Sequence, residues 1–310
     1  MPVSSGRTTI AVAICTFKRN EPLTLLLESL IASAERVRDR AAVGIVIVDD
    51  TKDEQARPVA EAFANRFELG LHYRVSGKQN ISLARNLAIA TAMELGEWTA
   101  MTDDDCEVPG HWLEALLETQ ERTGADAVTG RMVRRVPEGS PRWITEEPFL
   151  ELGVEQFGDG AEMPSAATFN TMISSAWLKT NPDIRFAPAY GVVGGEDMVF
   201  FRAAKAAGLS IRFSEQGFVY ENESAERSTL RYQLYVYFWH GNSAALSCIE
   251  SGMSRPRMFV HGAASLVRAL GRPIGRSLRG KSPQLRFGLA QSLHAVGKLL
   301  GTIGIRIEHR

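Results

Sequence analysis

The sequence predicts an open, doubly wound α/β sheet that is followed by a helical extension. Strand-like and helical segments alternate through the first hundred residues, which is typical of successive βαβ units. The segments at residues 9–15 and 43–48 are almost continuously apolar, as expected of parallel strands buried on both faces. Each is followed by polar residues, and ligands of such sheets bind at the carboxyl ends of the strands. These observations predict one shared ligand site along one edge of the sheet.

The first half of the chain contains four predicted strands and three predicted helices. Asn20 and Pro22 provide a cap and an early proline for the first helix. The predicted strands cover residues 9–15, 43–48, 71–75 and 98–101, and the predicted helices cover residues 23–37, 53–67 and 82–95. The strand ends bring four polar groups to one edge: Thr16 to Arg19, Asp49 and Asp50, Lys78 to Arg85, and Asp103 to Asp105.

The second half of the chain is less regular. A long irregular stretch, residues 136–164, is more typical of a functional lid or an insertion than of a packed element. Further strands are predicted at residues 125–132, 166–174, 211–213 and 217–220, and helices at residues 198–207, 228–249, 258–270 and 285–300. A basic loop that contains Pro273 is expected to join the last two helices.

Three adjacent aspartates, Asp103, Asp104 and Asp105, end the fourth predicted strand. Two like charges about 4 Å apart repel by about 1 kcal/mol in water and about 4 kcal/mol at a protein surface, so a positive group should lie nearby. Divalent cations such as Mg²⁺ bind carboxylates and keep positions for substrate phosphates. In an extended segment Asp103 and Asp105 point to one side, so these two could hold the metal. The alternative is an acidic turn that caps the next helix.

A second acidic motif, Gly194-Gly195-Glu196-Asp197, begins a predicted helix. Glycines allow a backbone to approach a ligand closely. One carboxylate could act as a general base, since it need only be ionised and within about 3 Å of the proton it accepts. The alternative is a helix cap, because the helix dipole favours acids at this end by about 0.3–1 kcal/mol.

Composition and charge limit the partners. The 310-residue chain is 45% hydrophobic and has a net charge of −1. Residues 251–310 carry 11 Lys and Arg and one acid, so their net charge is +10, whereas residues 1–250 have a net charge of −11. A basic segment on an acidic body indicates a polyanionic partner, either a membrane or a nucleic acid; a solvated helical face is the alternative.

Other features favour a cytoplasmic protein. The first residues lack the basic and apolar regions of a signal peptide, and no apolar run is long enough to span a bilayer. Cys15, Cys106 and Cys248 are far apart in the sequence and fit neither a disulfide framework nor a zinc site. Neither G-x-G-x-x-G nor G-x-x-x-x-G-K-[ST] occurs at a strand end, which argues against dinucleotide-binding oxidoreductases and P-loop NTPases.

Taken in order, these motifs resemble those of glycosyltransferase family 2. The similarity covers about residues 8–245 and implies a GT-A fold, a Rossmann-like mixed, mostly parallel sheet with helices on both faces. It is carried by five motifs: the strand ending in Thr16-Phe17-Lys18-Arg19, Asp49-Asp50, Ile81-Ser82-Leu83-Ala84-Arg85-Asn86, Asp103-Asp104-Asp105 and Gly194-Gly195-Glu196-Asp197. Within the family, the chain is most similar to bacterial enzymes that build exopolysaccharides on lipid-linked acceptors.

The resemblance implies roles for individual residues. Asp103 and Asp105 match the family's D-x-D pair and would coordinate Mn²⁺ or Mg²⁺, with Glu221 as a further candidate ligand where some relatives have histidine. Asp197 would be the catalytic base, and Glu196 would bind the acceptor beside Gly194 and Gly195. The residues implied in binding the nucleotide-sugar are Thr16, Lys18, Arg19, Asp50, Asn80, Ser82, Arg85, Asp103 and Asp104. Among these, Asp50 would lie near the base, Arg85 near the ribose and diphosphate, and Asp104 at the ribose.

The expected enzyme is an inverting, metal-dependent glycosyltransferase that uses a nucleotide-sugar, a UDP-sugar in first place, and a saccharide or lipid-linked saccharide acceptor. It is expected to add one sugar per encounter, because the Q-x-x-R-W motif of processive relatives is absent.

The expected catalytic domain spans residues 8–250, with a nucleotide-binding half to residue 105 and an acceptor-binding half from residue 106. Residues 251–310 would be a basic helical extension that contacts the anionic inner face of the plasma membrane; no nucleic-acid partner is expected. The two alternatives are a haloacid-dehalogenase-type phosphatase and a non-catalytic carbohydrate-binding or scaffold protein.

Overall fold

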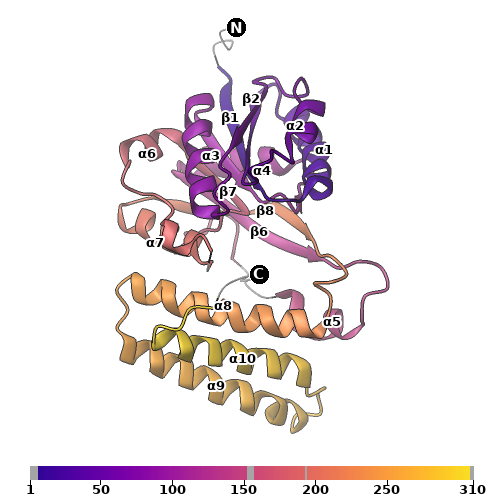
Figure 1. Ribbon diagram of the computed structural model, residues 1–310, viewed down its shortest axis with the longest axis vertical. Coiled ribbons are helices and arrows are strands. Elements are labelled where there is room, and N and C mark those ends of the chain that lie inside the picture. The colour runs from indigo at the N-terminus through magenta and orange to yellow at the C-terminus, as the bar shows by residue number, and fades with distance from the viewer. Residues whose placement is uncertain (1–5, 152–156, 193, 308–310) are drawn as a thin grey trace. The chain divides into compact units, whose positions relative to one another are not determined.

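The computed structural model describes residues 6–151, 157–192 and 194–307 (Figure 1). The chain forms two compact units. The sheet unit comprises Met1–Val133, Val154–Gly191 and Glu196–Asn222, and the helical unit comprises Arg134–Gly153, Val192–Gly195 and Glu223–Arg310. The predicted catalytic domain, which ends at residue 250 and is divided at residue 105 into a nucleotide-binding and an acceptor-binding half, stays a prediction.

The sheet unit contains one eight-stranded mixed sheet with the order β3-β2-β1-β4-β7-β6-β8-β5. Strand β1 pairs in parallel with β2 and β4, β2 pairs in parallel with β3, and β7 is antiparallel to β4 and β6. Its strands are β1 (Thr8–Thr16), β2 (Ala41–Asp49), β3 (Leu71–Val75), β4 (Trp98–Thr102), β5 (Cys106–Glu107), β6 (Ala127–Arg135), β7 (Asn170–Ser174) and β8 (Ile211–Asn222). The last two residues of β6 belong to the helical unit.

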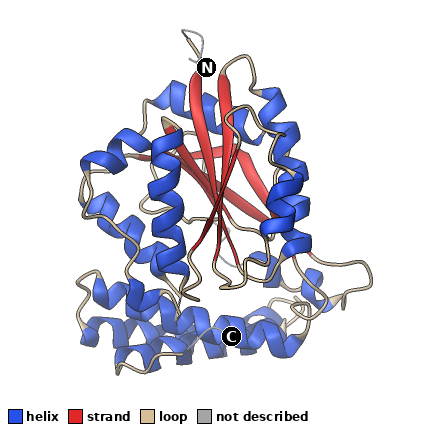
Figure 2. Cartoon of the chain, turned by 45° about the horizontal axis from the view of Figure 1, so that its top comes forward, coloured by secondary structure: helices blue, strands red, loops and turns tan. Residues whose placement is uncertain are grey.

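Helices cover both faces of this sheet (Figure 2). Alternate residues of β1 divide between two cores, because successive strand side chains point to opposite faces. Ile10, Val12 and Ile14 pack in the first core with α1, α2 and α4, whereas Ala11 and Ala13 pack in the second core with α3 and α7. The helices of the unit are α1 (Asn20–Arg36), α2 (Arg57–Ala62), α3 (Ile81–Leu95), α4 (Trp112–Thr123), α6 (Ser175–Thr180), the 3₁₀ turn η2 (Pro188–Tyr190) and α7 (Glu196–Ala206).

Three predictions within the sheet unit are wrong in detail. Helix α1 begins at Asn20 itself, and the preceding Arg19 is its N-cap, so Asn20 is not the cap. Helix α2 is shorter than the predicted 53–67, because residues 51–56 form a turn in which the buried Asp49 carboxylate accepts the N–H groups of Thr51 and Ala56, both at 2.8 Å. The two short strands predicted at 211–213 and 217–220 are one continuous strand, β8.

The helical unit consists of α5 (Trp143–Glu146), the 3₁₀ turn η1 (Pro148–Glu151), α8 (Leu230–Glu250), α9 (Arg255–Ser277) and α10 (Leu285–Thr302). Helix α10 lies along both α8 and α9 (Figure 1). Glycines allow the close approach of α8 and α10: a Cβ on Gly241 would fall 1.9 Å from the His294 carbonyl oxygen, and one on Gly297 would fall 2.1 Å from that of Phe238. The buried side chain of Asn242 joins the same helices, because its amide donates to the Gly297 carbonyl at 3.2 Å.

Two more predictions change in this unit. The predicted loop around Pro273 is helical, since α9 continues to Ser277. Proline removes one backbone hydrogen bond, but the Pro273 ring packs against α10 at Gly288, where a Cβ would lie only 3.0 Å from Cγ of Pro273. Residues 152–156 of the irregular stretch predicted at 136–164 lie outside the described residues. The part of the stretch in the helical unit contains α5 and η1, and Phe149 is fully buried there against Trp143 and Phe287.

Candidate active site

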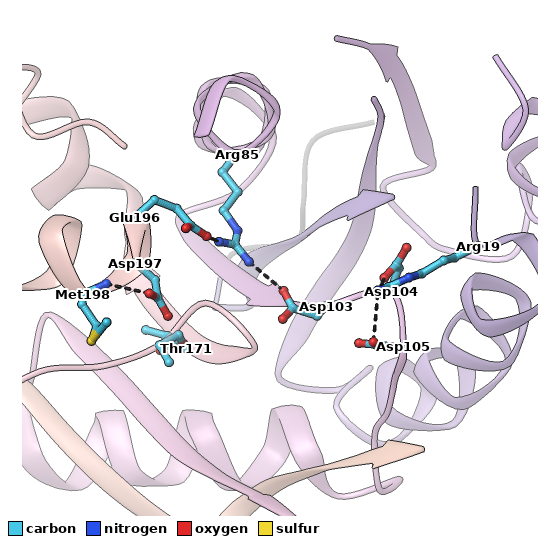
Figure 3. Close-up of polar contacts among 10 residues, drawn as sticks. Arg19, Arg85, Asp103, Asp104, Asp105, Thr171, Glu196, Asp197 and Met198 are labelled. Carbon is cyan, nitrogen blue, oxygen red and sulfur yellow. Dashed lines mark hydrogen bonds and ion pairs between the residues drawn. The ribbon is translucent and has the colours of Figure 1, made fainter. Parts of the chain in front are cut away.

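The carboxyl ends of β1, β2, β3 and β4 bring together most of the predicted site residues, all within the sheet unit. Thr16 ends β1, Asp50 follows β2, Arg85 lies in the first turns of α3, and the three aspartates follow β4. Glu196 and Asp197 begin α7 and belong to the same unit. Figure 3 shows the central contacts among these side chains.

Asp104 connects the end of β1 to the turn after β4. Thr16 Oγ1 donates to Asp104 Oδ2 at 2.8 Å, and an Arg19 N–H donates to Asp104 Oδ1 at 3.0 Å. Burial raises the pKa of Asp104 to about 6, although Arg19 acts in the opposite direction. Arg19 also donates to Asp105 Oδ2 at 2.8 Å, so one guanidinium offsets two of the three adjacent charges. The predicted contact of Asp104 with the ribose stays a prediction. In the structure, one of its oxygens accepts from Thr16 and the other accepts from Arg19.

Arg85 occupies the centre of the site (Figure 3). One guanidinium N–H donates to Asp103 Oδ1 at 3.1 Å, and another pairs with Glu196 Oε1. Burial opposes the positive charge of Arg85, but Glu196 and Asp103 more than compensate and hold the pKa of its guanidinium above the ordinary value. Arg85 therefore links the turn after β4 to the start of α7. Together with Arg19, it supplies the positive charge that the run of aspartates led us to expect.

Asp197 lies partly buried beside this pair. The backbone N–H of Met198 donates to Asp197 Oδ1 at 2.7 Å. Burial and the neighbouring Glu196 raise the pKa of Asp197 to about 6, against the effect of Arg85. A carboxylate with this pKa is ionised at neutral pH and yet binds a proton more readily than an ordinary aspartate, which suits a general base.

Asp50 organises the loop that leads into α3. One oxygen accepts the backbone N–H groups of Lys78 and Gln79 at 2.9 and 3.0 Å, and the other accepts that of Asn80 at 2.7 Å. Asn80 caps α3 by accepting the N–H of Leu83 at 3.2 Å. The predicted contact of Asp50 with the base stays a prediction, and the observed contacts give this residue a structural part in shaping the loop.

The sequence did not reveal several features of this edge. Lys18 and Gln79 have positive φ values of 57° and 51°, which non-glycine residues rarely adopt outside tight or functional loops. Gly191 approaches Asn80 so closely that a Cβ would fall 1.8 Å from Asn80 Oδ1. Gly191 lies three residues before the motif Gly194-Gly195-Glu196-Asp197, and this proximity is the one sequence signal that could have drawn attention to it.

The remaining predicted residues have varied surroundings. Ser82 is fully buried in α3, and its hydroxyl has no hydrogen-bond partner within the part of the chain that the structure describes. Glu221 lies in β8 opposite Cys106, the residue that follows Asp105. Gly194 and Gly195 have φ values of 78° and 86°, and a Cβ on Gly194 would fall 2.2 Å from the Trp239 ring within the helical unit. The predicted ligand contacts of these residues stay predictions.

The carboxylates of Asp103 and Asp105 fit a hard divalent cation. Their side chains are 37% and 14% exposed, so oxygen ligands are accessible at the edge of the sheet. Over residues 6–151, 157–192 and 194–307, no three His, Cys, Asp or Glu side chains converge to hold a metal unaided. That is the usual situation for Mg²⁺, which takes one or two protein carboxylates and completes its shell with water and substrate phosphates. The donor set therefore fits a metal that binds together with a diphosphate.

Comparison with known proteins agrees with this geometry. A family model described as "Glycosyl transferase family 2" matches residues 11–181, which include most of β1 and all the strands from β2 to β7. The succinoglycan biosynthesis protein ExoM of Rhizobium meliloti (strain 1021) is 28% identical over 96% of this chain and 94% of its own length. A glucosyl-dolichyl phosphate glucuronosyltransferase of Haloferax volcanii is 24% identical over 76% of this chain and 75% of its own length.

Among solved structures, that of S. aureus TarS 1–349 in complex with UDP-GlcNAc has a TM-score of 0.56 and 17% sequence identity. The similarity covers 86% of this chain and 75% of TarS 1–349. Likeness at this level of identity reflects a shared fold, and it confirms the GT-A architecture that the sequence predicted.

Proposed function

The chain belongs to glycosyltransferase family 2, and on that premise we propose that it is an inverting, metal-dependent enzyme that transfers one sugar per encounter from a UDP-sugar to a hydroxyl of a saccharide or lipid-linked saccharide. Family membership sets aside the phosphatase and the non-catalytic alternatives. The observation that carries the proposal is the cluster of Arg85, Asp103, Glu196 and Asp197, which combines a base with carboxylates suited to a metal-bound diphosphate.

In this proposal Asp197 accepts the proton of the acceptor hydroxyl as the hydroxyl oxygen attacks the anomeric carbon. The attack occurs opposite the nucleoside diphosphate, so the configuration at this carbon inverts. Glu196 orients the acceptor, and its pairing with Arg85 fixes its position relative to Asp103. Asp197 is partly buried, which limits the number of water molecules that compete with the acceptor for the base.

In this proposal Arg85 and the metal ligands stabilise the negative charge of the leaving nucleoside diphosphate. Asp103 and Asp105 would hold Mn²⁺ or Mg²⁺, which when bound stabilises negative charge on the diphosphate. Arg85 already neutralises part of the acidic charge at this edge and lies within hydrogen-bond distance of Asp103. The charge on the departing diphosphate grows in the transition state, where fixed positive groups lower the barrier most effectively.

The donor proposal is tested by a panel of UDP-, GDP- and dTDP-sugars, measured by thermal shift with and without Mn²⁺. We expect one UDP-sugar to raise the melting temperature when Mn²⁺ is present, because a ligand at 100 times its Kd stabilises by about 2.7 kcal/mol. TarS 1–349 has been crystallised with UDP-GlcNAc, which makes the UDP series the first choice. A shift with GDP- or dTDP-sugars alone would reject the UDP assignment, and an equal shift without metal would reject metal dependence.

A second prediction concerns pH. Because Asp197 must be ionised to accept a proton, we expect kcat/KM to fall about tenfold per unit as pH decreases below about 6, and to level off above that value. An aspartate with an ordinary pKa would keep its activity down to about pH 4. The measurement is kcat/KM between about pH 4.5 and 8 at saturating metal.

Glu196→Gln provides the control for the pH profile. Glu196 raises the pKa of Asp197, so neutralising it should move the acid limb to lower pH even if the maximal rate falls. The assignment of the base would be contradicted if the pH at half-maximal kcat/KM were the same in this variant as in the wild type. It would also be contradicted if the wild-type value were near the pKa of an ordinary aspartate. Donor affinity measured over the same range separates this effect from titration of the nucleotide.

A further inference from the structure

Helix α9 of the helical unit presents three distinct faces. One face, with Met258, Gly262 and Ala269, is buried; Leu299 and Lys298 of α10 lie next to Gly262, and Gly288 of α10 lies next to Pro273. A second face is apolar yet exposed. Its residues recur at spacings of three, four and seven, which places them along one stripe of a helix; they are Val260, Val267, Leu270, Ile274 and Leu278, the last directly after the helix.

The exposure of this apolar stripe is large. Val267 is 70% exposed and Leu278 is 83% exposed. Two leucines at the start of α10, Leu285 and Leu289, are also exposed. Single exposed apolar residues are common, whereas a contiguous set indicates an interaction surface. We call Val260, Val267, Leu270, Ile274 and Leu278 the apolar stripe.

The third face of α9 is basic. Arg257, Arg268 and Arg279 are exposed. Helical spacing places Arg257 and Arg268 together beside the apolar stripe, and Arg279 lies two residues after the helix, eleven residues on from Arg268. Other basic residues of the segment have contacts within the unit: Arg272 stacks on the Phe287 ring at 4.8 Å, Arg276 donates to the Ser282 carbonyl at 2.7 Å, and Arg286 pairs with Glu147 at 3.5 Å. The basic face is therefore a defined set of side chains and not simply the whole positive charge of the segment.

We propose that α9 is an interfacial helix that lies in the headgroup layer of an anionic lipid membrane, with the apolar stripe inserted among the acyl chains and the basic face against the headgroups. An exposed apolar face bordered by arginines is the pattern of helices that lie in the membrane surface. Within the described residues, no helix has the length and hydropathy needed to cross a bilayer. The proposal goes beyond sugar transfer and does not depend on it.

Charge favours a membrane over a second copy of the chain as the partner that covers the apolar stripe. A twofold dimer through the apolar stripe would bring the same surface of two chains together. The arginines beside the stripe would then approach the arginines of the other copy, which is unfavourable. Residues 251–310 carry a net charge of +10, so an anionic lipid surface complements both the charge and the apolar character of α9.

Insertion makes a different prediction from electrostatic attraction alone. Charge attraction fades as salt shortens the Debye length from about 8 Å towards 3 Å. Burial of apolar side chains is not weakened in this way. We therefore expect the full chain to float with vesicles of phosphatidylglycerol and phosphatidylcholine at low salt, and to remain partly bound in about 1 M salt.

Three variants test the two faces separately. Val267→Ser, Leu270→Ser and Ile274→Ser combined should lower partitioning at least tenfold and abolish the salt-resistant fraction, because burying one such side chain accounts for about tenfold or more. Arg257→Gln, Arg268→Gln and Arg279→Gln combined should lower low-salt binding about a hundredfold, at about fivefold for each basic residue. Leu25→Ser, which changes a 48% exposed leucine on α1 of the sheet unit, should change nothing.

The outcomes separate the alternatives. Unchanged binding of the serine variant, or complete release of the wild-type chain by salt, would overturn insertion. Equal binding to pure phosphatidylcholine vesicles would overturn the role of the basic face. Absence of flotation, together with self-association that the serine variant loses in sedimentation velocity, would assign the stripe to a second copy of the chain. Circular dichroism and UDP binding of each variant establish that it is folded. Neither measurement requires lipid, so a failure of the proposed enzymatic function is distinguished from a failure of the membrane proposal.

Discussion

Asp197→Asn should lower turnover by a factor of about 10² to 10⁴, the usual contribution of a positioned general base. Asparagine has nearly the same shape as aspartate but cannot accept the acceptor's proton. The substitution removes a charge that burial disfavours, since burial is the main reason for the raised pKa of Asp197. We therefore expect the melting temperature to be kept or slightly increased. Turnover is measured with the donor that the nucleotide panel identifies.

The affinity for the donor distinguishes a base from a binding residue. Asp197 acts on the acceptor hydroxyl, so the Kd for UDP and metal should change little in Asp197→Asn. Asp183 is an exposed aspartate in the sheet unit, and Asp183→Asn provides the matched control with unchanged turnover. Wild-type turnover in Asp197→Asn would mean that Asp197 only caps α7 and that another group is the base.

The fold of the first hundred residues could be predicted because its signals are local. The strands β1, β2 and β4 are short apolar runs that end in polar residues, and the more polar β3 covers the predicted residues 71–75. Parallel pairing then forces their carboxyl ends to one edge. For this reason the sequence was sufficient to place Thr16, Asp50 and Asp103 on the same side of the sheet.

The contacts within the site could not be predicted, because they join residues far apart in the sequence. Thr16 and Asp104 are 88 residues apart, and Arg85 and Glu196 are 111 residues apart. Sequence spacing indicates which edge a residue reaches but not which partner it meets. Arg85 was expected near the diphosphate, and only the structure reveals that it joins Asp103 to Glu196.

Helices were mispredicted where tertiary contacts outweigh local preference. The sequence 53–67 has helical character, yet Asp49 binds the backbone of Thr51 and Ala56 and delays α2 until Arg57. Conversely, Pro273 is a helix breaker by local rules, but its packing at Gly288 lets α9 continue. Continuation of α9 also aligns Val267, Ile274 and Leu278, so the apolar stripe could not be recognised while this segment was taken for a loop.

The remaining prediction concerns the metal ligands: Asp103→Ala and Asp105→Ala should each weaken Mn²⁺-dependent binding of UDP by at least about a hundredfold. Mutation of residues that merely support metal ligands costs about 10–100-fold, so loss of a ligand should cost at least as much. Desolvation and Asp105 raise the pKa of Asp103 although Arg85 opposes them, so a bound cation would relieve repulsion at this position. Titration calorimetry with UDP, with and without Mn²⁺, measures the effect.

Two controls make this result specific to the metal. Asp103→Asn keeps an oxygen that can accept from Arg85 but lacks the charge, so it should lose metal-dependent binding while keeping the melting temperature of the wild type. Asp39→Ala removes an exposed aspartate just before β2, at the opposite end of the parallel strands, and should change neither quantity. If both alanine variants bind UDP and Mn²⁺ as tightly as the wild type, Asp103 and Asp105 are not the ligands. The three aspartates would then be an acidic turn that Arg19 and Arg85 neutralise, and the diphosphate would have to be bound by cationic side chains alone.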